Sequence, residues 1–96
     1  MNEHNVEWEN YGFVIASRYR TKIVLDLLND PKTPKELSSD TGFYLSHVSS
    51  TLSDLIKRGI VECLTPGLRR GKVFALTQIG KTVAKKMEKR GHTALT

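Results

Sequence analysis

The sequence predicts a mainly α-helical domain with one small β-hairpin, an α+β arrangement. Three segments place apolar residues three and four positions apart, which is the spacing of one face of a helix. Two short segments near the middle alternate with a period of two, as half-buried strands do. The 96 residues can bury a single modest core. We therefore expect a three-helix core, a hairpin and a C-terminal helix.

The first of these helices is predicted to follow Ser17, a candidate N-cap. Its apolar face consists of Tyr19, Ile23, Val24, Leu27 and Leu28. The residue before Pro31 is kept out of the helical conformation, so the helix ends near Asn29. Before it lies Tyr11–Ala16, a short apolar run for which a strand and the lead-in to a helix both remain open.

Two further helices are predicted close together. Thr33 begins a capping box with proline at the first helical position, and Gly42 supplies a turn soon afterwards. The next helix runs from Leu45 to Arg58 and ends where Gly59 adopts a left-handed conformation. Its expected core face consists of Leu45, Val48, Leu52, Leu55 and Ile56. Two helices joined by a tight glycine-containing turn form a helix-turn-helix.

A hairpin and a last helix complete the predicted domain. Ile60–Leu64 and Lys72–Leu76 are the strands, and the loop between them carries Arg69 and Arg70 near its tip. Thr77 caps the last helix. Its expected core positions, four residues apart, are Ile79, Val83 and Met87. This organisation gives an N-terminal extension at 1–16, a domain at 17–90 and a flexible tail at 91–96.

Charge is distributed unevenly along the chain. The net charge is +5, but residues 1–30 carry −2, so the remainder carries +7. Such asymmetry indicates a polyanionic partner for one part of the molecule. No apolar run approaches the ~20 residues of a membrane span, and the polar N-terminus does not look like a signal peptide. With Cys63 as the one cysteine, we expect no disulfide and a cytoplasmic location.

No catalytic or metal-binding constellation is evident. The three histidines are scattered at His4, His47 and His92, and no cysteine–histidine cluster has ligand spacing. No glycine-rich phosphate loop follows a predicted strand. We therefore expect neither an enzyme, nor a metal, nor a cofactor.

The chain resembles winged helix-turn-helix DNA-binding proteins of the ArsR/MarR type, in particular small archaeal transcriptional regulators, over about residues 17–90. The stretches that carry the resemblance are GFYLSHVSSTLSDLIKRGIVECLTP and RRGKVFALTQIGK. The resemblance implies that the helix at 45–58 enters the major groove of double-stranded DNA. It also implies that residues 65–72 form a wing on the backbone or minor groove, and that the protein is a homodimer. It indicates no particular small-molecule effector.

The outward residues of the 45–58 helix fit this role. Serine is a mediocre helix former, and small hydroxyls allow close approach to a groove and bond bases or phosphates. The candidate DNA-binding residues of this recognition helix are Tyr44, Ser46, His47, Ser49 and Ser50. An ordinary solvated surface is the alternative. Long arginines and glutamines are missing from the first two turns, so specificity is either weak or rests on shape and water.

Cations in and near the loop are the candidates for affinity. Arg69, Arg70 and Lys72 are the expected wing contacts, and the alternative is a solubilising loop. Each phosphate contact adds about one unit to the salt dependence of binding. Lys35 and Ser53 are weaker candidates for the DNA backbone. Lys57 and Arg58 are expected to complement the C-terminus of their own helix.

The N-terminal aromatic residues Trp8, Tyr11 and Phe13 are candidate homodimer contacts, together with the last helix. Folding back onto the chain's own core is the equally open alternative. Two other functions remain open beside regulation: a winged-helix protein-interaction module, and a non-specific or architectural nucleic-acid-binding protein.

Overall fold

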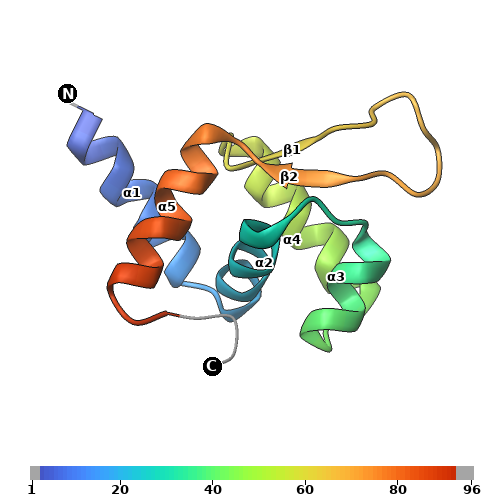
Figure 1. The fold of residues 1–96 in the computed structure, drawn as a ribbon, viewed down its shortest axis with the longest axis horizontal. Helices are drawn as coiled ribbons and strands as arrows, with labels where there is room; N and C mark the ends of the chain where they lie inside the picture. The colour runs from blue at the N-terminus through green and yellow to red at the C-terminus, as the bar shows by residue number, and fades with distance from the viewer. Residues whose placement is uncertain (1–2, 93–96) are drawn as a thin grey trace.

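The computed structural model describes residues 3–92 and contains five helices and one hairpin in this range (Figure 1). The elements in chain order are α1 (Glu3–Ile15), α2 (Arg18–Asn29), α3 (Pro34–Thr41), α4 (Leu45–Lys57), β1 (Val61–Cys63), β2 (Phe74–Leu76) and α5 (Gln78–Lys89). The predicted fold class is confirmed. Of the tail expected at 91–96, residues 93–96 lie outside the described part of the chain. No helix within residues 3–92 is both long and apolar enough to cross a membrane.

Helix α2 is the centre of the core. It contacts α1, α3, α4, α5 and β2, and its Ile23 and Val24 are fully buried. Leu37 of α3 and Leu55 of α4 are buried in the same cluster. Of the apolar stripe predicted for α2, Ile23, Val24 and Leu27 are buried in this core, Leu28 packs against it, and Tyr19 is exposed.

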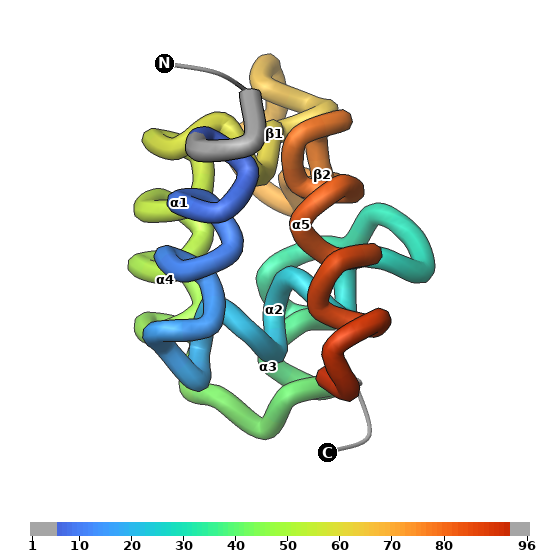
Figure 2. Tube along the Cα trace, turned by 90° about the vertical axis from the view of Figure 1, so that its left-hand side faces the viewer, coloured from blue at the N-terminus to red at the C-terminus, as the bar shows by residue number. Residues whose placement is uncertain are grey.

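Helix α1 is part of this core. The strand alternative for Tyr11–Ala16 is wrong, because the helix continues to Ile15. Val14 is fully buried, Tyr11 is nearly so, and α1 runs alongside α5 (Figure 2). Helix α1 thus packs through Tyr11 and Val14 against the helices that follow it.

The predicted helix starts are confirmed by their cap hydrogen bonds. Ser17 Oγ accepts from the backbone nitrogen of Arg20 at 3.3 Å. The Thr33 capping box is complete, since Thr33 Oγ1 accepts from Glu36 N at 3.1 Å and Glu36 Oε1 accepts from Thr33 N at 2.9 Å. Thr77 Oγ1 accepts from Gly80 N at 3.1 Å. Each cap satisfies a backbone donor that the first helical turn leaves free.

The hairpin is antiparallel, and a residue from another part of the chain forms backbone hydrogen bonds to it. Val61 pairs with Leu76 and Cys63 with Phe74. Lys32, between α2 and α3, forms an isolated bridge to Phe74, with N–O distances of 2.9 and 2.8 Å in the two directions. This bridge fixes the hairpin to the helix-turn-helix.

Gly80 allows α5 to approach the start of the hairpin closely. A Cβ atom at this position would collide with the carbonyl oxygen of Ile60 and lie 3.1 Å from the Cβ of Leu76. That carbonyl also accepts a hydrogen bond from the backbone nitrogen of Thr77 at 3.0 Å. The close approach sets where α5 lies relative to β1.

Three residues predicted for the core are exposed, and those predictions are wrong. They are Leu45, Ile56 and Ile79. On α4, the buried stripe is centred on Val48, Leu52 and Leu55, and at 100° per residue Leu45 and Ile56 lie at one edge of it. Ile79 lies in the first turn of α5, beside a hollow that faces α1.

Candidate nucleic-acid interface

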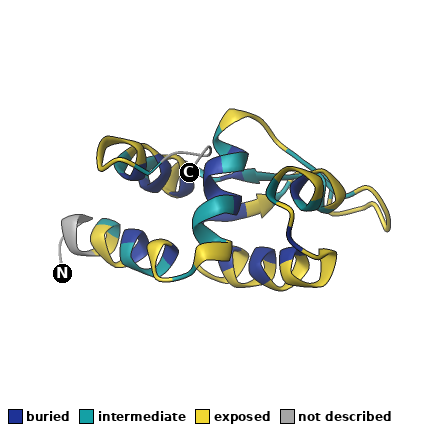
Figure 3. Cartoon of the chain, turned by 90° about the horizontal axis from the view of Figure 1, so that it is seen from below, coloured by how far each residue is buried: buried dark blue, intermediate teal, exposed yellow. Residues whose placement is uncertain are grey.

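The outward side of α4 is exposed along its length (Figure 3). Tyr44 occupies the N-cap position, makes no side-chain cap hydrogen bond, and is 78% exposed. The four serines predicted for this surface are all exposed: Ser46, Ser49, Ser50 and Ser53. The helix therefore presents a surface of small hydroxyls with a large aromatic residue at its start.

His47 belongs to an aromatic cluster at the first turn of α4. Its ring lies edge-on to Tyr19 of α2, with centroids 4.8 Å apart, and 6.1 Å from Tyr44. Tyr19 in turn packs against Phe43 at 4.6 Å. His47 remains exposed, so the cluster orients the imidazole without covering it.

The loop between the strands projects away from the helices (Figure 1). At its base, Leu64 N donates to Val73 O at 2.8 Å and Val73 N donates to Thr65 Oγ1 at 2.9 Å. Arg69 and Arg70 are both exposed. The two guanidinium groups are thus carried on a loop whose base is held by hydrogen bonds.

A hollow of about 290 Å³ joins the segments singled out from the sequence. We call it the α4–hairpin hollow; its lining is Pro34, Ser49, Leu52, Ser53, Ile56, Cys63, Lys72 and Phe74. Lys35, exposed, follows Pro34 directly. The start of α3, the middle of α4 and the base of the loop therefore meet on one surface.

Arg58 is placed differently from expectation. Its guanidinium carbon lies over the ring of Phe13 at 4.3 Å from the centroid, and that of Arg20 lies over the same ring at 4.0 Å. Arg20 Nε also donates to the carbonyl oxygen of Phe13 at 2.6 Å. These cation–π contacts connect α1 and α2 to the end of α4. Phe13 is accordingly half-buried by its own chain.

A partly buried ionic cluster links α2, α3 and the hairpin, and it was not predicted from the sequence. Lys32 Nζ lies 2.7 Å from both Asp26 Oδ1 and Asp40 Oδ2. Burial raises the pKa of Asp26, and its second oxygen, Oδ2, has no partner within the described residues. The hydrogen bond from Lys32 holds the pKa of Asp40 below its usual value. Because Lys32 also bridges to Phe74, the cluster holds the hairpin against the helix-turn-helix.

The sequence left two alternatives for the N-terminal aromatic residues: a homodimer contact, or packing against the chain's own core. Tyr11 folds back into the chain's own core, 7% exposed, with its hydroxyl 3.3 Å from His92 Nε2. Trp8 remains 45% exposed. Lys86 Nζ lies 4.3 Å and the guanidinium carbon of Arg90 lies 5.1 Å from its ring. Trp8 is therefore the member of the three that still presents a substantial apolar surface.

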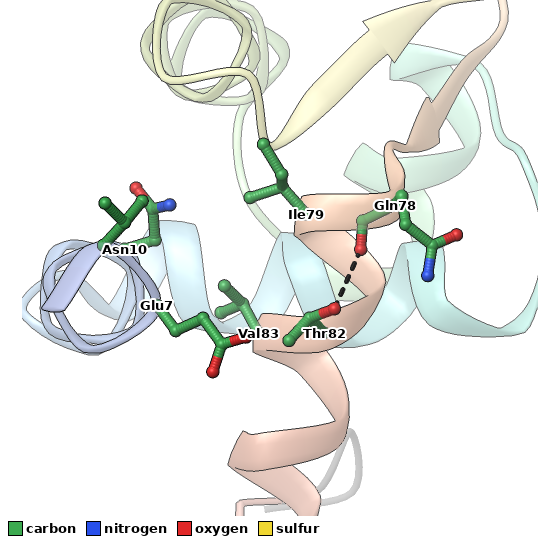
Figure 4. Close-up of a pocket in the computed structure, with 7 residues that line it drawn as sticks. Glu7, Asn10, Gln78, Ile79, Thr82 and Val83 are labelled. Carbon is green, nitrogen blue, oxygen red and sulfur yellow. Dashed lines mark hydrogen bonds between the residues drawn. The ribbon is translucent and has the colours of Figure 1, made fainter. Parts of the chain in front are cut away.

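A second hollow, of about 320 Å³, lies between α1 and α5 (Figure 4). We call it the α1–α5 hollow; its lining is Val6, Glu7, Asn10, Gln78, Ile79, Thr82 and Val83. Val6 and Ile79 are exposed in it, whereas Asn10 is nearly buried. The hollow thus combines three aliphatic side chains with two amides, a carboxylate and a hydroxyl.

Within residues 3–92, no group of three or more histidine, cysteine and acidic side chains is arranged to hold a metal ion. The thiol of Cys63 is free and half-buried in the wall of the α4–hairpin hollow.

A short helix, a turn, an exposed longer helix and a projecting hairpin define a winged helix-turn-helix domain. The structure is similar to HlyU from Vibrio cholerae N16961, with a TM-score of 0.74 and 22% identity over 95% of this chain and 98% of that one. It is also similar to the homodimeric winged helix-turn-helix DNA-binding domain of Mb0332 from Mycobacterium bovis, described as a possible ArsR-family transcriptional regulator. There the TM-score is 0.68, with 17% identity over 94% and 87% of the two chains.

These similarities confirm the winged-helix fold inferred from the sequence motifs. No protein-family model matches the chain, and no curated protein sequence matches it.

Proposed function

We propose that this protein binds double-stranded DNA and regulates transcription in the cytoplasm without catalysing a reaction. Helix α4 enters the major groove and the loop at 65–72 lies on the backbone or minor groove. The observation that carries the proposal is the α4–hairpin hollow, which joins the hydroxyl-rich helix to a loop with two exposed arginines. The Mycobacterium bovis domain of the same fold, described as DNA-binding, supports it.

The contacts are divided between the helix and the cations around it. Tyr44, Ser46, His47, Ser49 and Ser50 meet base edges or the nearest phosphates, because they project from the first half of the exposed helix. The expected backbone contacts are Arg69, Arg70, Lys72, Lys35 and Ser53. Affinity then comes mainly from the loop, since phosphate contacts release counterions.

We propose further that the protein is a homodimer that joins through α1 and α5. Val6 and Ile79 are exposed at the α1–α5 hollow, and Trp8 is exposed elsewhere on α1, so apolar side chains of both helices are available to a second copy. The similar Mycobacterium bovis domain is described as homodimeric. A two-fold dimer would read two half-sites about 34–36 Å apart.

The proposal is tested by measuring affinity for random-sequence and genomic duplexes across a salt series. Replacing both Arg69 and Arg70 with alanine should make the dependence of log K on log salt shallower by about two units. The matched control removes two lysines of α5 that are also exposed, Lys85 and Lys89, and should change the slope much less.

Three outcomes separate the functions. Salt-dependent binding with a sequence preference supports a regulator. Equal affinity for every duplex supports an architectural protein instead. Absence of binding at low salt would refute DNA binding and favour the protein-interaction module.

A further inference from the structure

Leu45 is the first residue of α4, and half of its side chain, 51%, is exposed. It follows Tyr44, which is still more exposed, and precedes Ser46. A single exposed leucine is ordinary on a protein surface. Leu45 lies in the first turn of the second helix of a helix-turn-helix, the part of this motif that most often contacts base edges. Its chemistry therefore influences which bases α4 recognises.

The neighbouring side chains limit which bases α4 can distinguish. Residues 44–53 contain no arginine, lysine, asparagine, glutamine, aspartate or glutamate. Those are the types that bond guanine or adenine in a bidentate manner or accept from cytosine. Serine hydroxyls bond either kind of base edge and phosphates as well, so they discriminate poorly. The thymine C5-methyl is the major-groove group that an apolar side chain recognises.

We propose that the first turn of α4 recognises thymine methyl groups in the major groove and that Leu45 contacts them. This proposal rests on the DNA binding proposed above. Charge complementarity indicates that the polyanion DNA occupies this surface. The exposed Arg69 and Arg70 lie on the loop beside α4, and residues 31–96 carry a net charge of +7. Ser46 and Ser49, on the C-terminal side of Leu45, are small enough for the helix to come within contact distance of the groove floor.

The experiment begins by selecting a preferred duplex from a random pool with the full chain. That duplex is then synthesised twice, once with thymine and once with deoxyuridine at every thymine position, which removes only the methyl groups. Affinities are measured at one fixed salt concentration for the wild type, Leu45→Ala and a control, Leu64→Ala. Leu64 is 48% exposed, like Leu45, but lines a different hollow on the other face of the hairpin.

Burying one methyl group contributes about 0.8 kcal/mol, which corresponds to about a fourfold change in affinity. We expect the wild type and Leu64→Ala to bind the deoxyuridine duplex at least about fourfold more weakly than the thymine duplex. Leu45→Ala should bind both duplexes equally, with the affinity that the wild type has for deoxyuridine.

Equal losses in the wild type and in Leu45→Ala would overturn the proposal, because the methyl groups would then act through another residue or through DNA shape. Equal binding of both duplexes by the wild type would overturn it as well. So would a pool from which no sequence is enriched while salt-dependent binding persists. In these cases DNA binding stands; absence of any salt-dependent binding refutes the proposed function itself.

Discussion

Gly80→Ala should destabilise the domain, although alanine is the better helix former. A Cβ at this position overlaps the carbonyl oxygen of Ile60 and crowds the Cβ of Leu76 at 3.1 Å. Overpacking of a rigid contact costs about 1–3 kcal/mol. Moving the Ile60 carbonyl also weakens its hydrogen bond from Thr77 N, which contributes about 1 kcal/mol.

The helix-propensity gain of about 1 kcal/mol offsets part of this cost. The expected net loss in the free energy of unfolding is about 2 kcal/mol. For a domain of this size, that lowers the melting temperature by roughly 8–16 °C. Urea and thermal unfolding followed by circular dichroism measure both quantities.

Gly12 offers a matched control in another helix. It lies within α1 with nothing within 4 Å of an added Cβ and no left-handed backbone conformation. Gly12→Ala should therefore stabilise the domain by up to about 1 kcal/mol. If Gly80→Ala proved as stable as the wild type, the close approach of α5 to the hairpin would be refuted.

Two further predictions concern the ionic cluster and the dimer. Lys32→Met should reduce stability by about 1–3 kcal/mol at pH 7, because the partly buried carboxylate of Asp26 loses its hydrogen-bonded cation. The loss of stability should become smaller as pH falls towards the raised pKa of Asp26, because burial favours the protonated carboxyl, which needs no cation. Unfolding of both proteins at pH 4 and pH 7 measures this difference. An equal loss at the two pH values would contradict the prediction. Trp8→Ala should shift the proposed dimer towards monomer in analytical ultracentrifugation, whereas the exposed Tyr44→Ala should not. A dimer equally stable in both variants would count against the proposed α1–α5 interface.

The local features of the fold were predictable from the sequence. The caps at Ser17, Thr33 and Thr77 depend on residues within three positions of one another, and all three are formed. The period-two strands were likewise found, although they are shorter in the structure. Where the physics is local, the residue pattern is sufficient.

Features that depend on distant contacts were not predictable. Apolar spacing places Leu45 and Ile79 on plausible helix faces, but only tertiary packing decides where the buried stripe ends. The approach of Gly80 to Ile60 and the cluster around Lys32 join segments that no helix or strand period relates. For the candidate site, the residues were named from the sequence, whereas the hollow that joins α3, α4 and the loop came from the structure.

We propose that α4 and the hairpin loop together form the DNA-binding surface. Titrating the isotope-labelled protein with a short duplex and following backbone amide shifts by NMR tests this most directly. We expect the largest shifts at residues 44–53 and 65–72, with α5 little affected. Shifts concentrated on α1 and α5, with α4 and the loop unchanged, would contradict it.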